Sequence, residues 1–200
     1  MKKKKTIERI FLGKKELAKV EDSIRFHEHL RRYAAVRRFC YGRVLDFACG
    51  CGYGSYLLSQ NPEVKKVYGV DIDPSAITWA KEEFENGKTS FYKTDINNFK
   101  NQVDTLVCLE TIEHLENLPA ISALIKRCNI GQVIISFPDK KSTHFNPFHM
   151  HDFVVQDLVD LFKGFVLYHR FKHGDVQFLL FVKAPHGMPH HMVRNIKDLS

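Results

Sequence analysis

The sequence lacks a long apolar run, and this absence narrows the class of protein. No stretch of the 200 residues is apolar over the length that a membrane-spanning helix needs. The basic start, Met1 followed by four lysines, does not continue into the apolar segment of a secretion signal, because charged residues such as Glu8 and Arg9 interrupt it. We therefore expect a cytoplasmic protein with no membrane partner.

A paired-cysteine motif is also absent. The five cysteines include no CxxC pair, so the sequence indicates neither a zinc ribbon nor a disulfide framework. Two of them, Cys49 and Cys51, lie within a glycine-rich segment. Reduced thiols in a reducing compartment are the simpler interpretation.

Basic residues outnumber acidic ones, with 30 Lys and Arg against 23 Asp and Glu and a formal net charge of +7. A basic excess favours acidic partners such as nucleotides, sugar phosphates or nucleic acid. The basic residues near the start are not interleaved with aromatic residues, as a groove for single-stranded nucleic acid would prefer. The alternative is that the basic residues form a solvated face and a frayed tail. We expect a loosely held basic segment over residues 1–20, followed by one domain over residues 21–200.

Hydrophobic periodicity predicts one helix and then a regular alternation of strands and helices. The first helix is expected over residues 21–39, where apolar side chains are spaced mostly for one face. Strands are expected at 43–48, 66–70, 90–93, 103–109, 132–137, 164–170 and 176–182. Further helices are expected at 55–60, 74–85, 118–127 and 154–162.

This alternation predicts the α/β fold class. We expect a Rossmann-like three-layer sandwich, in which a mostly parallel sheet with a C-terminal antiparallel hairpin lies between layers of helices. Ligands of such sheets bind at the carboxyl ends of the strands. That rule brings Asp46, Asp71, Asp95 and Glu110 to one rim, together with the glycine-rich loop 50–54.

The loop between the first strand and its helix reads VLDFACGCGYGS over residues 44–55. Its glycines let the backbone turn sharply and approach a ligand. The third glycine, Gly54, comes one residue early for the GxGxxG motif of dinucleotide sites, and Asp46 would repel a pyrophosphate. A nicotinamide dehydrogenase is therefore the weakest enzyme interpretation. An acid at this strand end suits a ligand with an amino group and a sulfonium charge.

The second strand ends in the segment GVDIDP. Asp71 at that strand end is placed to accept hydrogen bonds from both hydroxyls of a ribose. Ile72 would lie against an adenine face, and Asp95 after the third strand would accept a hydrogen bond from the adenine amino group.

At this point the sequence resembles the class I S-adenosylmethionine-dependent methyltransferases over about residues 43–138. The resemblance rests on LDFACGCGYGS, GVDIDP, the Thr94-Asp95 pair and LETIEH. It implies S-adenosyl-L-methionine as cofactor and S-adenosyl-L-homocysteine as product. The cofactor-binding residues that it implies are Arg32, Tyr33, Asp46, Ala48, Gly50, Gly52, Tyr53, Asp71, Ile72, Asp95, Ile96 and Glu110. Ala48 is a mild departure, because many members have glycine there.

Within that set, the resemblance implies different parts of the cofactor for different residues. Asp46, Gly50 and Gly52 would hold the methionine part, Asp71 the ribose and Asp95 the adenine.

The HLRRY segment over residues 29–33 is similar to the HLxRY stretch of a group often found with glycan and secondary-metabolite pathways. In that role Arg32 or Tyr33 would close over the cofactor carboxylate, for which arginine is a good partner. Alternatively, Tyr33 packs the helix and Arg32 is solvated.

Candidate catalytic residues follow the fourth strand. Glu110, Glu113 and His114 recur at i, i+3 and i+4, so they would share one face if this turn is helical. An acceptor hydroxyl or amine must lose a proton during methyl transfer, and histidine is the usual base. His114 and then His149 are the candidate bases, with Glu110 as the third catalytic candidate.

The same carboxylates and imidazoles would also suit a divalent metal ion. Small-RNA 2′-O-methyltransferases resemble this sequence in a Glu-x-x-Glu-His pattern and a later histidine that act on metal. The string is also common in class I enzymes without metal, where it shapes the pocket floor, so no metal ligand is assigned. The histidines near the end are expected to be exposed and without function: His186, His190 and His191.

The NPFHMHDF segment over residues 146–153 resembles the NPFHxxEF element of the glycan-associated type, and would form a lid over the acceptor. A compatible alternative is a helix entry, with Asp152 as the cap and Phe148 and Phe153 packed inward.

The sequence therefore predicts methyl transfer from S-adenosyl-L-methionine to an oxygen or nitrogen of a small molecule. A phosphorylated or nucleotide-linked acceptor such as a sugar nucleotide is favoured, because no separate domain for recognising a polymer is expected. The alternatives are a nucleic-acid methyltransferase, with or without metal, and a catalytically idle cofactor-binding protein that partners another protein.

Overall fold

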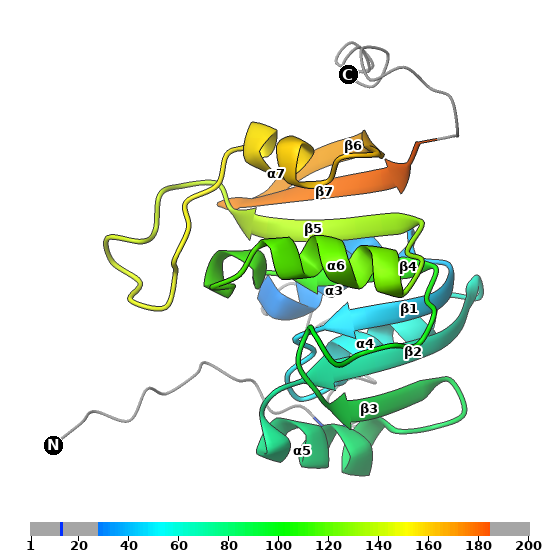
Figure 1. Ribbon diagram of the computed structural model, residues 1–200. Helices are drawn as coiled ribbons and strands as arrows, with labels where there is room; N and C mark the ends of the chain where they lie inside the picture. Colours follow the sequence, from blue (N-terminus) through cyan, green and yellow to red (C-terminus); the bar gives the residue numbers. More distant parts are fainter. Residues whose placement is uncertain (1–12, 14–27, 185–200) are drawn as a thin grey trace, which may run out of the picture.

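The computed structural model describes residue 13 and residues 28–184. A sheet of seven strands organises these residues, in the order β3-β2-β1-β4-β5-β7-β6. Figure 1 shows α6 and α7 in front of the sheet and α3 and α4 behind it. The predicted Rossmann-like sandwich is confirmed.

Five strands are parallel and two close the sheet in the opposite sense. The parallel strands are β1 (Gly42–Phe47), β2 (Val64–Asp71), β3 (Thr89–Lys93), β4 (Thr105–Leu109) and β5 (Gln132–Pro138). The closing strands are β6 (Phe165–His173) and β7 (Val176–Lys183), and β7 pairs antiparallel with both β5 and β6. The predicted C-terminal hairpin is thus confirmed, and it covers the β5 edge of the parallel strands.

The described helices also follow the predicted order. They are α3 (Glu28–Arg37), α4 (Tyr53–Ser59), α5 (Pro74–Phe84), the 3₁₀ helix η1 (Ile112–His114), α6 (Pro119–Arg127) and α7 (Val155–Leu161). Helix α3 is the described part of the helix expected over 21–39. Residues 21–27, the basic segment 1–20 and the histidines His186, His190 and His191 lie outside the described residues.

Local capping explains where α5 begins. The side chain of Asp73 accepts hydrogen bonds from the N–H groups of Ser75 and Ala76, at 2.7 and 3.2 Å. Pro74 occupies the first turn, where its missing N–H costs no hydrogen bond. The segment GVDIDP therefore ends one element and starts the next within a few residues.

The start of α7 differs from the prediction. Asp152 is not its cap, because Val154 precedes the helix and donates its N–H to Asp157 Oδ2 at 2.8 Å. Asp152 instead accepts from the N–H of Ser142 at 2.6 Å and from the hydroxyl of Thr143 at 2.6 Å. The carboxylate of Asp152 therefore joins two parts of the loop before α7 and does not cap that helix.

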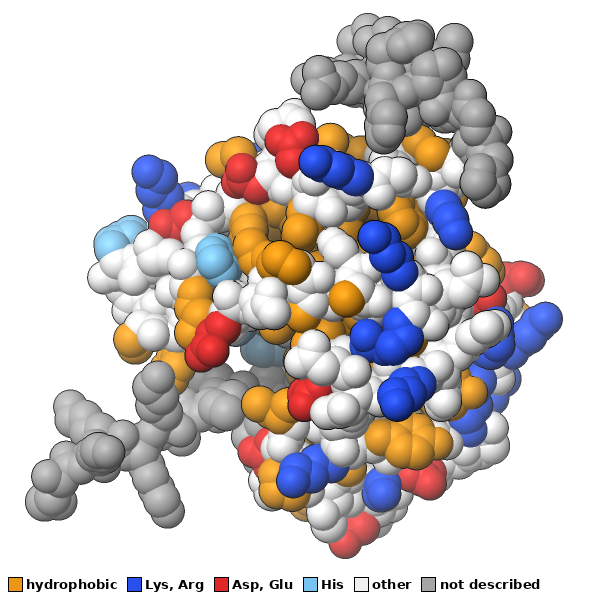
Figure 2. Space-filling model, in the orientation of Figure 1, with side chains coloured by type: hydrophobic (Ala, Val, Ile, Leu, Met, Phe, Trp, Pro, Cys, Tyr) orange, Lys and Arg blue, Asp and Glu red, His pale blue; other side chains and the backbone are white. Residues whose placement is uncertain are grey.

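Strand alternation divides the core between the two faces of the sheet. Leu45 packs in front with the residues of α6 and α7, whereas its neighbour Val44 packs behind with α3, α4 and α5. Figure 2 shows lysine and arginine side chains spread over the front face. Among the described residues, no helix has both the length and the apolar character needed to cross a membrane.

The carboxyl ends of the five parallel strands lie at one rim. Figure 1 shows their arrowheads pointing to the left, toward the segment 139–154 that follows β5. We call this segment the lid. The topology therefore brings the glycine-rich loop, the ends of β2 to β4 and the lid to the same side of the molecule.

Candidate active site

The loop after β1 has a backbone that most residues adopt with difficulty. Ala48, Gly50 and Gly52 all have positive φ angles, of 59°, 55° and 86°. A Cβ at Gly52 would lie 2.6 Å from the Cβ of Ala80 and 2.9 Å from the ring of Phe91. Glycine at this position thus lets the loop pack closely over α5 and β3.

Asp71 at the end of β2 clamps this loop. Its Oδ2 accepts the N–H of Gly50 at 2.9 Å, and its Oδ1 accepts the N–H of Asp73 at 2.9 Å. The next residue, Ile72, is 66% exposed. The end of β2 therefore presents a carboxylate in a fixed orientation beside an exposed apolar side chain, as a nucleoside site requires.

The end of β3 continues the rim. The N–H of Thr94 donates to the carbonyl of Asp71 at 3.0 Å, which joins the two strand ends. Asp95 accepts from the N–H of Asn97 at 2.7 Å and from the side-chain amide of Asn98 at 2.9 Å, and Ile96 is buried beside it. Asp71, Asp95 and Ile96 thus lie at adjoining strand ends, as the sequence predicts.

Asp46 lies beneath the loop and not on its surface. It is fully buried, Tyr33 donates its phenolic hydroxyl to Oδ1 at 3.0 Å, and Ser55 donates its hydroxyl to Oδ2 at 2.6 Å. Burial raises the pKa of Asp46 to about 7, although the hydrogen bonds from Ser55 and Tyr33 oppose this shift. The structure therefore gives the carboxylate two protein partners that the sequence did not predict.

The neighbours Arg32 and Tyr33 face different parts of the site. Arg32 Nη2 lies 3.6 Å from Glu110 Oε2 and 3.9 Å from Glu28 Oε2, and its side chain is 14% exposed. Tyr33 is turned inward and packs edge to face on Tyr53, with ring centroids 6.0 Å apart. Tyr33 thus packs the helix, as the alternative interpretation held, while Arg32 is paired at the rim and is not a solvated surface residue.

Glu110 follows β4 in a left-handed backbone conformation with a φ of 48°. Its Oε1 accepts the hydroxyl of Ser136 at 2.8 Å, and burial raises its pKa while Arg32 opposes the shift. The expectation of a helical face shared by Glu110, Glu113 and His114 is wrong, because η1 begins only at Ile112.

Glu113, His114 and His149 nevertheless meet. Glu113 is 1% exposed, its Oε2 has no hydrogen-bond partner, and its Oε1 lies 4.0 Å from His114 Nε2. One ligand atom from each of the three side chains lies within 4.8 Å of the others. Burial, followed by repulsion from Glu110, raises the pKa of Glu113 to about 8.

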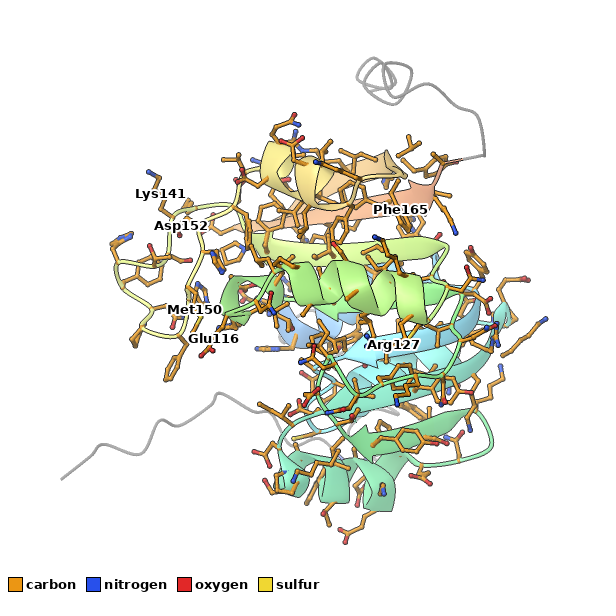
Figure 3. All side chains as sticks on the ribbon, viewed as in Figure 1. Glu116, Arg127, Lys141, Met150, Asp152 and Phe165 are labelled. Carbon is orange, nitrogen blue, oxygen red and sulfur yellow. The ribbon has the colours of Figure 1, made fainter. Side chains whose placement is uncertain are left out.

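The lid is held against η1 by hydrogen bonds. The N–H of Met150 donates to the carbonyl of Glu113 at 2.7 Å, and His114 Nδ1 lies 2.9 Å from the carbonyl of Phe148. His151 Nε2 lies 2.9 Å from the carbonyl of Leu115. Figure 3 shows Met150 next to Glu116 at this junction. Both candidate bases therefore depend on the lid for their orientation.

Sequence reasoning missed the serines that orient these groups. Ser55 and Ser136 bind the carboxylates of Asp46 and Glu110, and Ser142 Oγ lies 2.5 Å from His149 Nδ1. Ser55 lies in α4, Ser136 in β5 and Ser142 in the lid, and only Ser55 falls within a motif, the end of the glycine-rich segment. Their roles arise from contacts between segments distant in the sequence.

Comparison with known proteins identifies the family. A methyltransferase domain model matches residues 41–159, which is more than half of the chain, so the chain belongs to this family. The mitochondrial ubiquinone biosynthesis O-methyltransferase of Saccharomyces cerevisiae is 31% identical over 90 residues, covering 42% of this chain and 28% of that protein. The match thus spans less than a third of that relative's length.

Solved structures share the fold. The magnesium protoporphyrin IX methyltransferase of Synechocystis PCC 6803, crystallised with bound SAH, has a TM-score of 0.65 at 20% identity and covers 90% of each chain. The methyltransferase domain of bacterial CtHen1 has a TM-score of 0.60 at 19% identity, covering 78% of this chain and 96% of that one.

Family and fold together define a class I S-adenosylmethionine-dependent methyltransferase. The chain is therefore an enzyme of the transferase class, and the nicotinamide dehydrogenase interpretation is wrong.

Proposed function

We propose that the chain transfers a methyl group from S-adenosyl-L-methionine to an oxygen or nitrogen of a small molecule. The observation that carries this proposal is that one rim of the sheet holds both a candidate nucleoside-binding surface and two candidate catalytic histidines. The loop held by Asp71 and the exposed Ile72 would form a nucleoside site, and His114 and His149 meet at the lid.

The cofactor would lie along the ends of β1 to β4. Asp71 retains lone pairs for the ribose hydroxyls beside its two backbone contacts, and Ile72 offers its exposed side chain to the adenine. Asp95 would accept from the adenine amino group. The methionine part would lie on the loop at Gly50 and Gly52, with these neighbours completing its binding surface: Ala48, Tyr53, Ile96 and Glu110.

Arg32 would bind the methionine carboxylate. Its guanidinium lies at the rim 3.6 Å from Glu110, within reach of a second carboxylate without a large rearrangement. Asp46 would act indirectly by holding the loop, because it is fully buried and accepts hydrogen bonds from Tyr33 and Ser55.

The cofactor would supply an electrophilic methyl group, which the acceptor oxygen or nitrogen would take as the methyl–sulfur bond breaks to leave a thioether. His114 or His149 would accept the proton that the acceptor loses. Burial and the nearby His114 lower the pKa of His149, so this ring is largely neutral at pH 7 and able to accept the proton. Placement in line with the sulfonium methyl would provide the remaining catalysis.

A phosphorylated or nucleotide-linked acceptor, such as a sugar nucleotide, could pair with the exposed Lys141 of the lid. Lys141 and His144 are exposed on this segment, and Figure 3 shows Lys141 at its outer side. Among the relatives, the yeast protein is named as an O-methyltransferase of ubiquinone biosynthesis, which supports methyl transfer to an oxygen of a small molecule.

Calorimetric titration with S-adenosyl-L-homocysteine tests the cofactor site. We expect micromolar affinity for the wild type and a loss of at least about tenfold for Asp71→Asn, which removes a charged acceptor. Asp160→Asn is the matched control, since Asp160 is exposed on α7 away from the rim. A wild type that binds neither cofactor nor product would overturn the proposal. Acceptors are then screened by product formation, beginning with nucleotide sugars.

A second candidate, metal-assisted methylation of a nucleic acid, is favoured by the cluster of Glu113, His114 and His149. Each ring has its Nδ1 engaged, on the carbonyl of Phe148 or the hydroxyl of Ser142, which leaves Nε2 for a ligand. The buried Oε2 of Glu113 has no partner, and such a group is costly unless something binds it. One carboxylate oxygen and two imidazoles fit a divalent ion, which would polarise an acceptor hydroxyl.

Titration with Mn²⁺ distinguishes the two candidates. The metal-assisted candidate predicts binding to the wild type, loss of binding in Glu113→Gln, and unchanged binding in Glu116→Gln, whose side chain is exposed beyond η1. It also predicts methylation of an RNA oligonucleotide that a chelator abolishes. Turnover of a small acceptor that survives chelation would instead support the first candidate.

A further inference from the structure

Tyr33 packs beneath the glycine-rich loop and is not exposed on the outer surface of that loop. The residue is 8% exposed, donates its hydroxyl to Asp46 Oδ1 at 3.0 Å, and packs edge to face on Tyr53. A Cβ added to Gly54 would overlap the Tyr33 ring. One side chain of α3 therefore touches the strand end, the loop and the first turn of α4.

The close approach of the Tyr33 ring to Gly54 explains how α3 and α4 can both donate hydrogen bonds to the Asp46 carboxylate. Only a glycine leaves room for the Tyr33 ring at the first turn of α4. The next residue, Ser55, donates to Asp46 Oδ2 at 2.6 Å, opposite the oxygen that Tyr33 uses. Asp46 at the end of β1 thus links the two helices through one fully buried group.

Arg32 is the neighbour of Tyr33 on α3, and successive helical residues point about 100° apart. When Tyr33 faces the core, Arg32 faces the rim, where Nη2 lies 3.6 Å from Glu110 Oε2. A small rotation of α3 would displace Arg32 relative to the loop. Holding a binding group within a fraction of an ångström requires this kind of support from packed neighbours.

We propose that Tyr33 is a positioning residue for the cofactor, and that its hydrogen bond to Asp46 holds α3 so that Arg32 lies over the methionine end of the site. This inference rests on the proposed function of the rim, in which Arg32 binds the cofactor carboxylate. It assigns Tyr33 an indirect role, distinct from closing over the cofactor itself.

A purely structural role for Tyr33 predicts something different. A side chain that only stabilises the fold would affect cofactor affinity to the same extent whether or not Arg32 is present. A residue that acts by placing Arg32 loses its effect once Arg32 has been replaced. A double-mutant cycle on cofactor affinity separates these two cases without knowledge of the acceptor.

The cycle uses calorimetric titration of the full chain with S-adenosyl-L-homocysteine. Tyr33→Phe removes the hydroxyl and keeps the ring on Gly54, so we expect it to fold and to weaken affinity about fivefold, the effect of one hydrogen bond. In the Arg32→Gln background the same change should weaken affinity by less than about twofold. Tyr56→Phe is the matched control, because the Tyr56 ring packs on Phe84 and the hydrogen bonds to Asp46 come from Tyr33 and Ser55; it should leave affinity unchanged.

Hydrogen exchange of the folded variants provides a second measurement. The amides of α3 should exchange faster in Tyr33→Phe than in the wild type, and at the wild-type rate in Tyr56→Phe. Equal losses of affinity in both Arg32 backgrounds, or no loss at all, would overturn the positioning role while leaving the cofactor site intact. Failure of the wild type to bind S-adenosyl-L-homocysteine would overturn the proposed function, and this inference with it.

Discussion

His114 and His149 meet edge to face at the rim, with ring centroids 4.7 Å apart and ring planes at 81°. One histidine ends η1, and the other belongs to the lid. Each Nδ1 is engaged by a lid atom, the carbonyl of Phe148 or the hydroxyl of Ser142. The lid thus determines which nitrogen of each ring faces the site, and its contacts can be tested individually.

The first prediction concerns the protonation of His149. Burial lowers its pKa, repulsion from His114 lowers it further, and Asp152 partly opposes the shift. We expect a titration midpoint below the usual value for histidine in the wild type. His114→Ala removes the like charge and should raise this midpoint. NMR titration of the histidine C2–H signals measures both, with the exposed lid residue His144→Ala as control; an unchanged midpoint in His114→Ala would contradict the coupling.

The second prediction concerns the anchoring of the lid by Asp152. The Thr143 hydroxyl and the Ser142 N–H lower the pKa of this carboxyl to about 2, so it accepts both hydrogen bonds throughout the neutral range. Because the folded pKa is depressed, the contribution to stability is present above the unfolded value of 3.8 and is lost as the pH falls through about 2.

Replacement of Asp152 should therefore loosen the lid at pH 7 without unfolding the core. We expect amide exchange over residues 142–152 to be about tenfold faster in Asp152→Asn, while the global melting temperature changes little. Asp160→Asn on α7 is the control. Wild-type exchange rates in Asp152→Asn would show that these hydrogen bonds do not anchor the lid.

The third prediction concerns the packing of α3 on α4. Gly54→Ala should destabilise the fold by about 1–3 kcal/mol, because the added Cβ overlaps the ring of Tyr33 inside a packed core. Gly87→Ala is a matched control, since nothing lies within 4 Å of a Cβ there. Urea unfolding of both variants measures the difference. Equal stabilities for the two variants would mean that Tyr33 can move aside without cost.

The fourth prediction concerns the buried carboxyl of Asp46, whose pKa burial raises from 3.8 to about 7. The folded state binds this proton more tightly than the unfolded state. The resulting stabilisation is complete below the unfolded value of 3.8 and is lost as the pH rises through about 7.

Asp46→Asn removes this titration, because an amide stays neutral. It also loses one acceptor oxygen, so at pH 4 the variant should be less stable than the wild type by about 1–3 kcal/mol. The deficit should narrow as the pH rises to 8. Free energies of unfolding across this range measure it, and a constant deficit would show that Asp46 does not titrate as described.

Local sequence patterns predicted most of the strands and helices of the fold. Mostly apolar runs such as 103–109 and 132–137 predicted buried parallel strands, and Asp73-Pro74 marked the start of α5. These signals are reliable because periodicity and capping depend on residues only a few positions apart. The rule that ligands bind at the carboxyl ends of strands then brought Asp71 and Asp95 to one rim without any coordinates.

The same reasoning did not reveal partners that distant segments of the chain supply. The sequence assigned Asp46 to the cofactor and gave no sign that Tyr33 and Ser55 each donate a hydrogen bond to it. Asp152 was assigned to a helix that Val154 and Asp157 begin. An aspartate in the sequence gives no indication of whether its carboxylate will bind a ligand, a hydroxyl or a backbone N–H. The residue type alone therefore cannot distinguish these roles.

The sequence by itself determined the succession of strands and helices along the chain and the loop that turns at Gly50 and Gly52. It also determined the rim of the sheet at which the candidate functional residues lie. Only the tertiary structure decided which atoms meet there: Arg32 with Glu110, and Glu113 with the two histidines. The reason is physical. Secondary structure follows from short-range periodicity, whereas the direction and protonation of a polar side chain follow from burial and from partners that other segments of the chain supply.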